Sequence, residues 1–256
     1  MIGRIALALL LASLGPPCYA QAHKEYQPET FQEGKDVVWV PTPQAVVDRM
    51  LDMARVTPSD SVIDLGSGDG RTVITAAKRG ARAVGVEYNP DMVELSTRNA
   101  EKEGVSARAT FVKADLFETD FSEYSVITMF LLPSINLKLR PKILALKPGT
   151  RIASNSFDMA DWKADEVADL TKSGACEGVS YCTALLWIVP ARVAGTHKLS
   201  QGELVLEQTF QRLTGTLRAH GRTLPVAGSV RGEDVSFTAG GREYRGRMNG
   251  KRLELR

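Results

Sequence analysis

The stretch that decides the fold is VIDLGSGDGRT, residues 62–72. A short apolar run ends in a carboxylate, Asp64, and three glycines follow at alternate positions, Gly66, Gly68 and Gly70. Glycines let a backbone approach a ligand closely and adopt torsions that other residues avoid. A helical pattern begins directly afterwards, and the start of a helix offers free N–H groups and a positive dipole end. The stretch therefore predicts a strand, a ligand-binding loop and a helix in succession.

The chain on either side of this loop alternates between apolar strands and helices. The expected strands are 61–65, 82–87, 109–113, 125–131, 151–154 and 184–189, and the expected helices are 43–54, 71–79, 90–103, 137–146 and 164–170. Such alternation implies crossover connections and a parallel α/β sheet with helices on both faces. Ligands of these sheets bind at the carboxyl ends of the strands, where the glycine loop lies.

The pattern changes after residue 193. Short alternating runs are separated by glycine-containing turns such as RGED, AGGRE and NGK, which is typical of a β-meander. We expect a small all-β domain over residues 196–256, either a partly closed barrel or a sheet packed on the first domain. Phe237, Tyr244, Met248 and Leu253 are candidates to fill one of its faces. Because about sixty residues bury little core, we expect this domain to lean on its neighbour.

The N-terminal residues have the layout of a secretory signal peptide. Arg4 precedes a short apolar run at 5–14, and Cys18-Tyr19-Ala20 supplies small residues before a cleavage point. The run is too short to span a bilayer as a helix. We therefore predict a signal peptide at 1–20, a flexible polar arm at 21–36 and a main domain at 37–195. The expected location is the periplasm, with no stable transmembrane segment after cleavage; the alternative is a membrane tether formed by an uncleaved N-terminus.

Charge and cysteine content limit the partners. The chain has 32 basic and 30 acidic residues, a net charge of +2 that gives no electrostatic footprint for nucleic acid. We accordingly expect no nucleic-acid partner, and we assign no residues to a metal. Cys176 and Cys182 are the cysteines left after signal cleavage. They would form one disulfide in an oxidising compartment or remain two thiols, and the sequence leaves both readings open.

Three kinds of ligand compete for the glycine loop. A phosphate-binding loop needs a lysine after its glycines, which this loop lacks, and a dinucleotide loop needs glycine where Arg71 stands. Asp64 would also repel a pyrophosphate. S-adenosylmethionine has no phosphate, and its amino-acid ammonium suits that carboxylate. Glu87, at the end of the second strand, can accept both ribose hydroxyls, and Asp115, after the third, can accept the adenine amino group. The sequence thus predicts an S-adenosylmethionine site.

Several motifs lie at corresponding places of a known family. They are VPTP (40–43), DLGSGDGR (64–71), VGVEYNP (84–90), ADLF (114–117), FLLPSINLKLRPKI (130–143) and LKPGTRI (146–152). With them, residues 37–193 resemble a Rossmann-like class I methyltransferase. More narrowly, they resemble the protein-lysine methyltransferase family whose mitochondrial members modify the ATP synthase c-subunit and the adenine nucleotide translocase. The signal peptide and the β-rich tail are not part of this resemblance.

The resemblance implies roles for matching positions. Asp64, Gly66 and Gly68 would hold the methionine part of the cofactor, Glu87 the ribose and Asp115 the adenine. The predicted cofactor-binding set is completed by Ser67, Gly70, Tyr88 and Leu116. The VPTP motif would lie near the transferred methyl group, so the substrate-side candidates are Thr42, Pro43 and Pro133. Thr42 and Pro43 equally suit the start of a helix.

The loop after the fourth strand bears on the methyl acceptor. Enzymes that methylate adenine or glutamine usually carry Asn/Asp-Pro-Pro-Tyr there, whereas this chain has Phe130-Leu131-Leu132-Pro133. An apolar rim suits a lysine stem or a membrane-embedded protein substrate, although Leu131 and Leu132 would also suit packing of the sheet edge. We therefore expect an S-adenosylmethionine-dependent methyltransferase acting on protein lysine. The alternative is an exported nucleoside- or S-adenosylmethionine-binding module without catalysis, whose β domain serves interactions.

Overall fold

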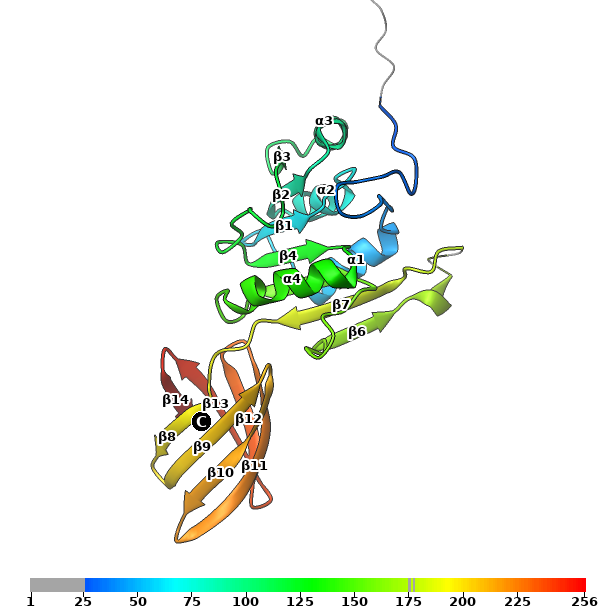
Figure 1. The fold of residues 1–256 in the computed structure, drawn as a ribbon. Helices are drawn as coiled ribbons and strands as arrows, with labels where there is room; N and C mark the ends of the chain where they lie inside the picture. Colours follow the sequence, from blue (N-terminus) through cyan, green and yellow to red (C-terminus); the bar gives the residue numbers. More distant parts are fainter. Residues whose placement is uncertain (1–25, 175, 177) are drawn as a thin grey trace, which may run out of the picture.

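The computed structural model describes residues 26–174, 176 and 178–256, so the predicted signal peptide and the first five residues of the arm lie outside the described residues. The described chain forms an α/β body followed by a β body (Figure 1). In the first, seven strands pair in the order β3-β2-β1-β4-β5-β7-β6. Their bounds are β1 (Ser61–Leu65), β2 (Arg82–Glu87), β3 (Ala109–Lys113), β4 (Val126–Met129), β5 (Arg151–Asn155), β6 (Glu166–Asp169) and β7 (Thr183–Ile188). β1 to β5 pair in parallel, and β7 alone runs in the opposite direction, antiparallel to its neighbours β5 and β6, which confirms the predicted Rossmann-like sheet.

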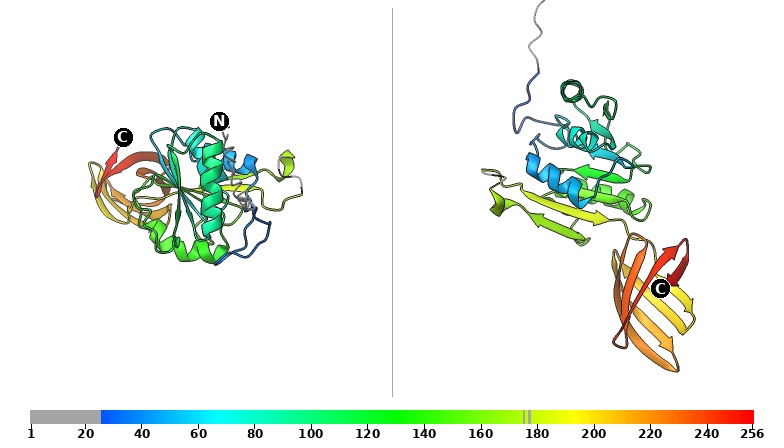
Figure 2. Two further views of the ribbon diagram at one scale, coloured as in Figure 1. Left: turned by 90° about the horizontal axis from the view of Figure 1, so that it is seen from above. Right: turned by 180° about the vertical axis from the view of Figure 1, so that it is seen from behind.

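Helices cover both faces of this sheet. They are α1 (Gln44–Met53), α2 (Arg71–Lys78), α3 (Pro90–Lys102) and α4 (Pro133–Leu144). The views from the front and from behind show α4 and α1 on opposite faces (Figures 1 and 2). Alternate residues of β1 serve the two layers: Val62 joins the core under α1 and α2, while Ile63 and Leu65 join the core under α4. This buried strand therefore fixes the position of the loop that follows it.

Two local predictions are wrong in instructive ways. Residues 164–170, expected as a helix, instead contain strand β6 and lead into a 3₁₀ turn, η1 (Thr171–Ser173). Alanine, glutamate and leucine favour a helix locally, but Val167 pairs with Leu185 of β7 and the backbone joins the sheet. Helix α4, which was expected to start at residue 137, instead starts four residues earlier at Pro133, because a proline is well suited to the first helical position.

The expected helix cap at Thr42 is also corrected. Helix α1 begins at Gln44, with Pro43 at the N-cap position, and the Pro43 carbonyl accepts from the N–H groups of Val46 and Val47. The backbone carbonyl of Thr42 accepts instead from Arg71 Nη1 at 2.8 Å. Thr42 is thus bonded to the first residue of α2 and does not cap its own helix.

The C-terminal body confirms the predicted small all-β domain. Its strands follow one another as an antiparallel meander: β8 (Gly195–Leu199), β9 (Gly202–Thr209), β10 (Arg212–Ala219), β11 (Arg222–Arg231), β12 (Asp234–Ala239), β13 (Arg242–Asn249) and β14 (Arg252–Leu255). The sheet curls around its own core (Figure 1). Phe237 stacks on Tyr244 with ring centroids 4.9 Å apart, and Met248 pairs with Leu253.

Three glycines allow the sheet to curl. A Cβ atom on Gly215, Gly228 or Gly246 would collide with a backbone carbonyl oxygen of the neighbouring strand, that of Val205, Ser236 or Glu254. Glycine in a strand marks a site where another backbone approaches closely. The repeated glycine therefore lets each strand bend over its neighbour.

The β domain is attached at the edge of the first sheet where the parallel strands begin. Phe210, in the turn between β9 and β10, stacks on Trp162 at 6.0 Å, and the Arg140 guanidinium lies 5.5 Å from its ring centroid. Gln211 donates to the Lys163 carbonyl at 2.8 Å. The carboxyl ends of the strands, where the glycine loop lies, therefore face away from this joint (Figure 2).

We expect Phe210→Ala to loosen this joint. Removing a half-buried aromatic ring from its stack costs about 2 kcal/mol, so the two domains should unfold in more widely separated calorimetric transitions. Trypsin should also cut faster at Arg192, an exposed residue of the connecting segment. Phe31→Ala, at a side chain that is 64% exposed, serves as the control. Unchanged proteolysis in the Phe210 variant would show that other contacts hold the joint.

Candidate functional site

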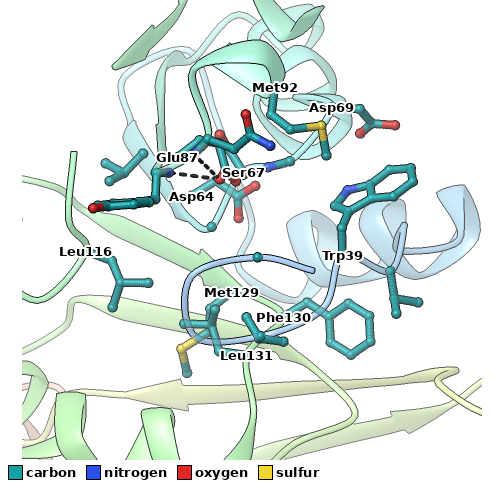
Figure 3. A pocket seen from close by; sticks show the side chains of 18 of the residues that line it. Trp39, Asp64, Ser67, Asp69, Glu87, Met92, Leu116, Met129, Phe130 and Leu131 are labelled. Atoms are coloured by element: carbon teal, nitrogen blue, oxygen red, sulfur yellow. Dashed lines mark hydrogen bonds between the residues drawn. The ribbon is translucent and has the colours of Figure 1, made fainter. Parts of the chain in front are cut away.

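A pocket opens at the carboxyl ends of β1, β2 and β4, beside the glycine loop (Figure 3). Nine of the predicted site residues line it: Thr42, Asp64, Gly66, Ser67, Gly68, Glu87, Tyr88, Asp115 and Leu116. The residues of the predicted arm from Gln32 onward lie over it. Pro43, Gly70 and Pro133 are not in the lining; the two prolines start helices, as described above. One pocket thus brings together carboxylates from three successive strand ends.

Asp64 is the buried acid at the end of β1. Its Oδ1 accepts from Thr128 Oγ1 at 2.6 Å. Burial, with smaller contributions from the negative charges of Glu87 and Asp69, raises the pKa of the Asp64 carboxyl to about 7, against the hydrogen bonds from Thr128 and Thr72. A carboxylate in such surroundings favours a cationic ligand group, because a nearby positive charge stabilises its ionised form.

Glu87 connects the end of β2 to the glycine loop. Its Oε2 accepts from the Gly68 N–H at 3.0 Å, and its Oε1 accepts from the N–H groups of Tyr88 and Asn89 at 2.8 and 2.9 Å. A carboxylate offers about four lone-pair positions. One position therefore remains for a ligand hydroxyl, and a second hydroxyl would have to share its oxygen with a backbone donor.

Asp115 is in contact with the N-terminal arm. Its Oδ1 accepts from the Phe117 N–H at 2.9 Å, and its Oδ2 forms an ion pair with Lys35. The hydrogen bond from Lys35 holds the pKa of Asp115 below its usual value. The same ammonium lies 4.7 Å from the centroid of the Tyr88 ring. Lys35 thus contacts Asp115, which the sequence assigned to the adenine, and Tyr88, another residue of the predicted cofactor-binding set.

The glycines of the loop have different tasks. Gly66 and Gly68 have φ angles of 79° and 52°, and both line the pocket. A Cβ on Gly68 would lie 2.5 Å from Trp39 Nε1, so the indole covers the loop closely. Gly70 caps α2 with φ 83°, and a Cβ there would meet Phe111 and Ser96 at 2.7 Å. Its lack of a side chain therefore serves the packing of α2 against neighbouring elements.

The pocket also has walls that the sequence analysis did not identify. They include Lys35, Trp39, Asp69, Met92 and Met129. Arg71 holds part of this wall: its Nε donates to both carboxylate oxygens of Asp69, at 3.0 and 3.1 Å, and its Nη1 to Thr42. For Trp39 the only signal was the apolar run VVWV before the VPTP motif, and that run has no period from which a contact can be predicted.

We expect Gly68→Ala to weaken the binding of S-adenosylmethionine about tenfold. A left-handed backbone costs alanine on the order of 1 kcal/mol, and the new Cβ must displace Trp39. Gly104→Ala is the matched control, since Gly104 has φ 68° and its Cβ would meet nothing within 4 Å. In a calorimetric double-mutant cycle, adding Trp39→Ala to Gly68→Ala should cost little further affinity. Full additivity of the two effects would contradict the contact.

The residues present fit S-adenosylmethionine. Ser67 lines the pocket, but its Oγ is buried against Gly85 of β2 and has no hydrogen-bond partner within the described part of the chain. Asp64 suits an ammonium, Glu87 a hydroxyl and Asp115 an amino group. Met129 and Leu131 supply an apolar floor. The pocket therefore offers each part of the cofactor a chemically matching group.

Comparison with known proteins agrees with this geometry. The model of the ANTKMT methyltransferase domain matches residues 64–166. A protein-lysine N-methyltransferase of Saccharolobus islandicus (strain REY15A) is 50% identical over 134 residues, which cover 51% of this chain and 83% of the relative. The human lysine N-methyltransferase of the ATP synthase c-subunit is 38% identical over 130 residues, 50% of this chain and 55% of the relative, so this chain spans about half of that enzyme's length.

A solved structure is similar over the same part of the chain. It is described as an RNA methyltransferase from Salinibacter ruber in complex with S-adenosyl-L-homocysteine. The identity is 47%, the TM-score is 0.55, and the alignment covers 60% of this chain and 96% of that one. Together with the relatives, it shows the family: the chain belongs to the protein-lysine N-methyltransferase family of S-adenosylmethionine-dependent methyltransferases.

Proposed function

We propose that this protein transfers a methyl group from S-adenosylmethionine to the side-chain amine of lysine in another protein. The observation that carries the proposal is the buried carboxylate of Asp64 beside the glycine loop, in a chain of this family. Asp64 would take the ammonium of the cofactor's methionine part, Glu87 its ribose and Asp115 its adenine. Lys35 would then share Asp115 with the adenine amino group or move away from it.

Bound S-adenosylmethionine supplies a methyl group on a positively charged sulfur. The neutral lysine amine attacks it: its lone pair forms the N–C bond, the S–C bond breaks with both electrons staying on sulfur, and the extra proton on nitrogen leaves to water. The residues of this chain contribute alignment and exclusion of water, mainly through Trp39 and Phe130 on the pocket wall. Among the described residues, no histidine or cysteine lines the pocket, so we assign no protein base.

A protein acceptor fits this chain better than RNA, although one similar structure is described as an RNA methyltransferase. Residues 26–195, which form the pocket, contain 19 basic and 23 acidic residues and so carry no net positive charge to favour binding to phosphates. The loop after β4 presents Phe130 to the pocket in place of polar groups. Two of the relatives named above are lysine methyltransferases.

We propose further that the protein acts outside the cytoplasm, in the periplasm. Cys176 and Cys182 form a disulfide in the structure, which supports an oxidising compartment. Among the described residues, no helix has the length and apolar character needed to cross a membrane. Cell fractionation, with maleimide labelling of the denatured protein without reductant, tests the location: the protein should be periplasmic, with both thiols unreactive.

The acceptor can be identified with a deuterated methyl donor. The purified protein is incubated with deuteromethyl S-adenosylmethionine and, in separate reactions, with solubilised envelope proteins and with total RNA from a strain lacking the gene. In the reaction with envelope proteins, mass spectrometry should find the label on lysine, and it should find none when the Asp64→Asn variant is used. Label found only in the reaction with RNA would assign RNA as the acceptor. Failure of the folded protein to bind the donor would favour the non-catalytic binding module.

A further inference from the structure

Three aromatic side chains from separate segments gather beside the pocket. Phe130 follows β4, Phe157 follows β5, and Tyr181 precedes β7. The ring centroids of Phe130 and Phe157 lie 5.9 Å apart, and each lies 5.5 Å from that of Tyr181. All three are half-buried, and within the described part of the chain they lie outside both hydrophobic cores of the first domain. We call these residues the aromatic cluster.

Sheet topology places the cluster at the edge that carries the pocket. β4 and β5 end side by side, with Met129 opposite Ser154, and antiparallel β7 starts there, with Ala184 opposite Asn155. Phe130 itself lines the pocket. In Figure 3 it lies with Trp39 at the opposite end of the pocket from Leu116. Because Leu116 is next to Asp115, the proposed adenine position, the cluster adjoins the end where the methyl group would lie.

The backbone that carries Phe157 is held in an unusual conformation. Ser156 has φ 59°, which costs a residue other than glycine on the order of 1 kcal/mol or more. Its N–H donates to the Thr183 carbonyl at 2.7 Å. The Phe157 carbonyl accepts from Ser154 Oγ at 2.9 Å and from Asn136 Nδ2 at 3.2 Å. Such strain persists only where the surroundings fix it, so the backbone that carries Phe157 is held in place.

A disulfide holds the third ring. Tyr181 directly precedes Cys182, which is buried and bonded to Cys176. The bond closes a short loop across a sequence separation of six residues. The match to the ANTKMT methyltransferase domain ends at residue 166, before this loop begins. The disulfide thus constrains a part of the cluster that lies beyond the matched region.

We propose that Phe130, Phe157 and Tyr181 form the subsite that receives the acceptor lysine, and that the Cys176–Cys182 disulfide keeps Tyr181 in it. Aromatic faces bind the methylene stem of lysine by apolar contact, and they attract an ammonium head, most strongly a methylated one, by cation–π interaction. Half-exposed rings next to the methyl end of the pocket are available for both contacts. The inference rests on the proposed function, because it names the place where that acceptor binds.

Binding of a small product analogue tests the subsite. Nα-acetyl-Nε-trimethyllysine methylamide is titrated into the protein saturated with S-adenosylhomocysteine, and the neutral norleucine analogue is the reference ligand. Tyr181→Leu and Phe157→Leu should each lower the affinity for the trimethyllysine probe three- to tenfold, and the affinity for the norleucine probe much less. Tyr244→Leu, which removes a stacked tyrosine from the β domain, should leave the affinity within twofold of the wild type. Equal probe affinity in all variants would overturn the subsite.

Titrations with and without reductant test the role of the disulfide. Reductant should lower the affinity of the wild-type protein for the trimethyllysine probe several-fold. It should not change the affinity of the Cys176→Ala variant, which already lacks the disulfide. Probe affinity that is insensitive to reductant would remove the disulfide from the proposal. The affinity for S-adenosylhomocysteine is measured in every sample and should stay unchanged. Failure of the proposed function would appear separately, as loss of that affinity in the wild type.

Discussion

Asp64→Asn is expected to stabilise the ligand-free protein at pH 8 and to abolish its binding of S-adenosylmethionine. Burial raises the pKa of the Asp64 carboxyl from its usual 3.8 to about 7. The folded protein therefore holds a proton that the unfolded chain releases between these values, and the stability contributed by this group is lost as the pH rises through about 7. Three pKa units correspond to roughly 4 kcal/mol, of which we expect asparagine to recover about 2–4 kcal/mol.

Asparagine keeps the hydrogen bond from Thr128, because its amide oxygen can accept as Oδ1 does now. It lacks the negative charge that would pair with the ligand's ammonium. Removing one partner of a buried charge pair costs about 3 kcal/mol or more, so the affinity should fall at least about a hundredfold. In the wild type, the affinity should fall about twentyfold from pH 7.5 to 5.5 as Asp64 becomes protonated.

Thermal unfolding at several pH values measures the stability effect. The variant should melt roughly 5–15 °C higher than the wild type at pH 8, with the difference shrinking below pH 7 and vanishing near pH 4. Asp60→Asn is a control of opposite sign. Burial raises the pKa of Asp60, but hydrogen bonds from Arg151, Ser125 and Thr57 outweigh it and leave the pKa below 3.8. The stability from Asp60 is present above that pH and is lost on acidification, so its removal should destabilise the protein at pH 8. An unstabilised Asp64 variant at pH 8 would refute the raised pKa.

The sequence predicted the parts of the fold that depend on local pattern. β1 is a five-residue strand, largely apolar, that ends at a glycine loop, and Asn89-Pro90 marks the start of α3, where Asn89 caps the helix through the Asp91 N–H. β6 was missed because its four residues are half-exposed and are held by pairing with β7, which lies 14 residues further along the chain. Tertiary pairing of this kind overrides helix propensity and leaves no periodicity in the sequence.

The same distinction applies to the site. Asp64, Glu87 and Asp115 could be predicted because each lies at or just after the end of a recognisable strand, and parallel strands end at one edge. Trp39 and Lys35 could not, because they lie in the segment before α1, which has no periodic pattern. Trp39 covers Gly68, and Lys35 contacts Asp115, which is 80 residues away in the sequence. The aromatic cluster depends on the register of β5 and β7, which a local pattern does not specify.

Glu87→Gln is expected to lower the affinity for S-adenosylmethionine about a hundredfold, for a reason that can be separated from the role of Asp64. The carboxylate receives three backbone N–H groups, from Gly68, Tyr88 and Asn89. A glutamine amide would point its NH₂ at one of these donors, which leaves a donor unpaired and disturbs the loop. The charged hydrogen bond that we propose between Glu87 and the ribose would be lost as well, at about 1.5–3 kcal/mol. The two effects together exceed the loss of a single contact.

5′-Methylthioadenosine separates the two carboxylates, since it keeps the adenine and ribose of the cofactor and lacks its amino-acid part. Calorimetric titration should show that Glu87→Gln lowers the affinity for both ligands. Asp64→Asn should lower the affinity for S-adenosylmethionine and leave that for methylthioadenosine within about twofold of the wild type. Glu94→Gln makes the same chemical change at an exposed position of α3 and should affect neither ligand. If Asp64→Asn weakened the binding of methylthioadenosine and Glu87→Gln did not, the cofactor would lie in the pocket in the reverse orientation. The aromatic cluster would then adjoin its adenine.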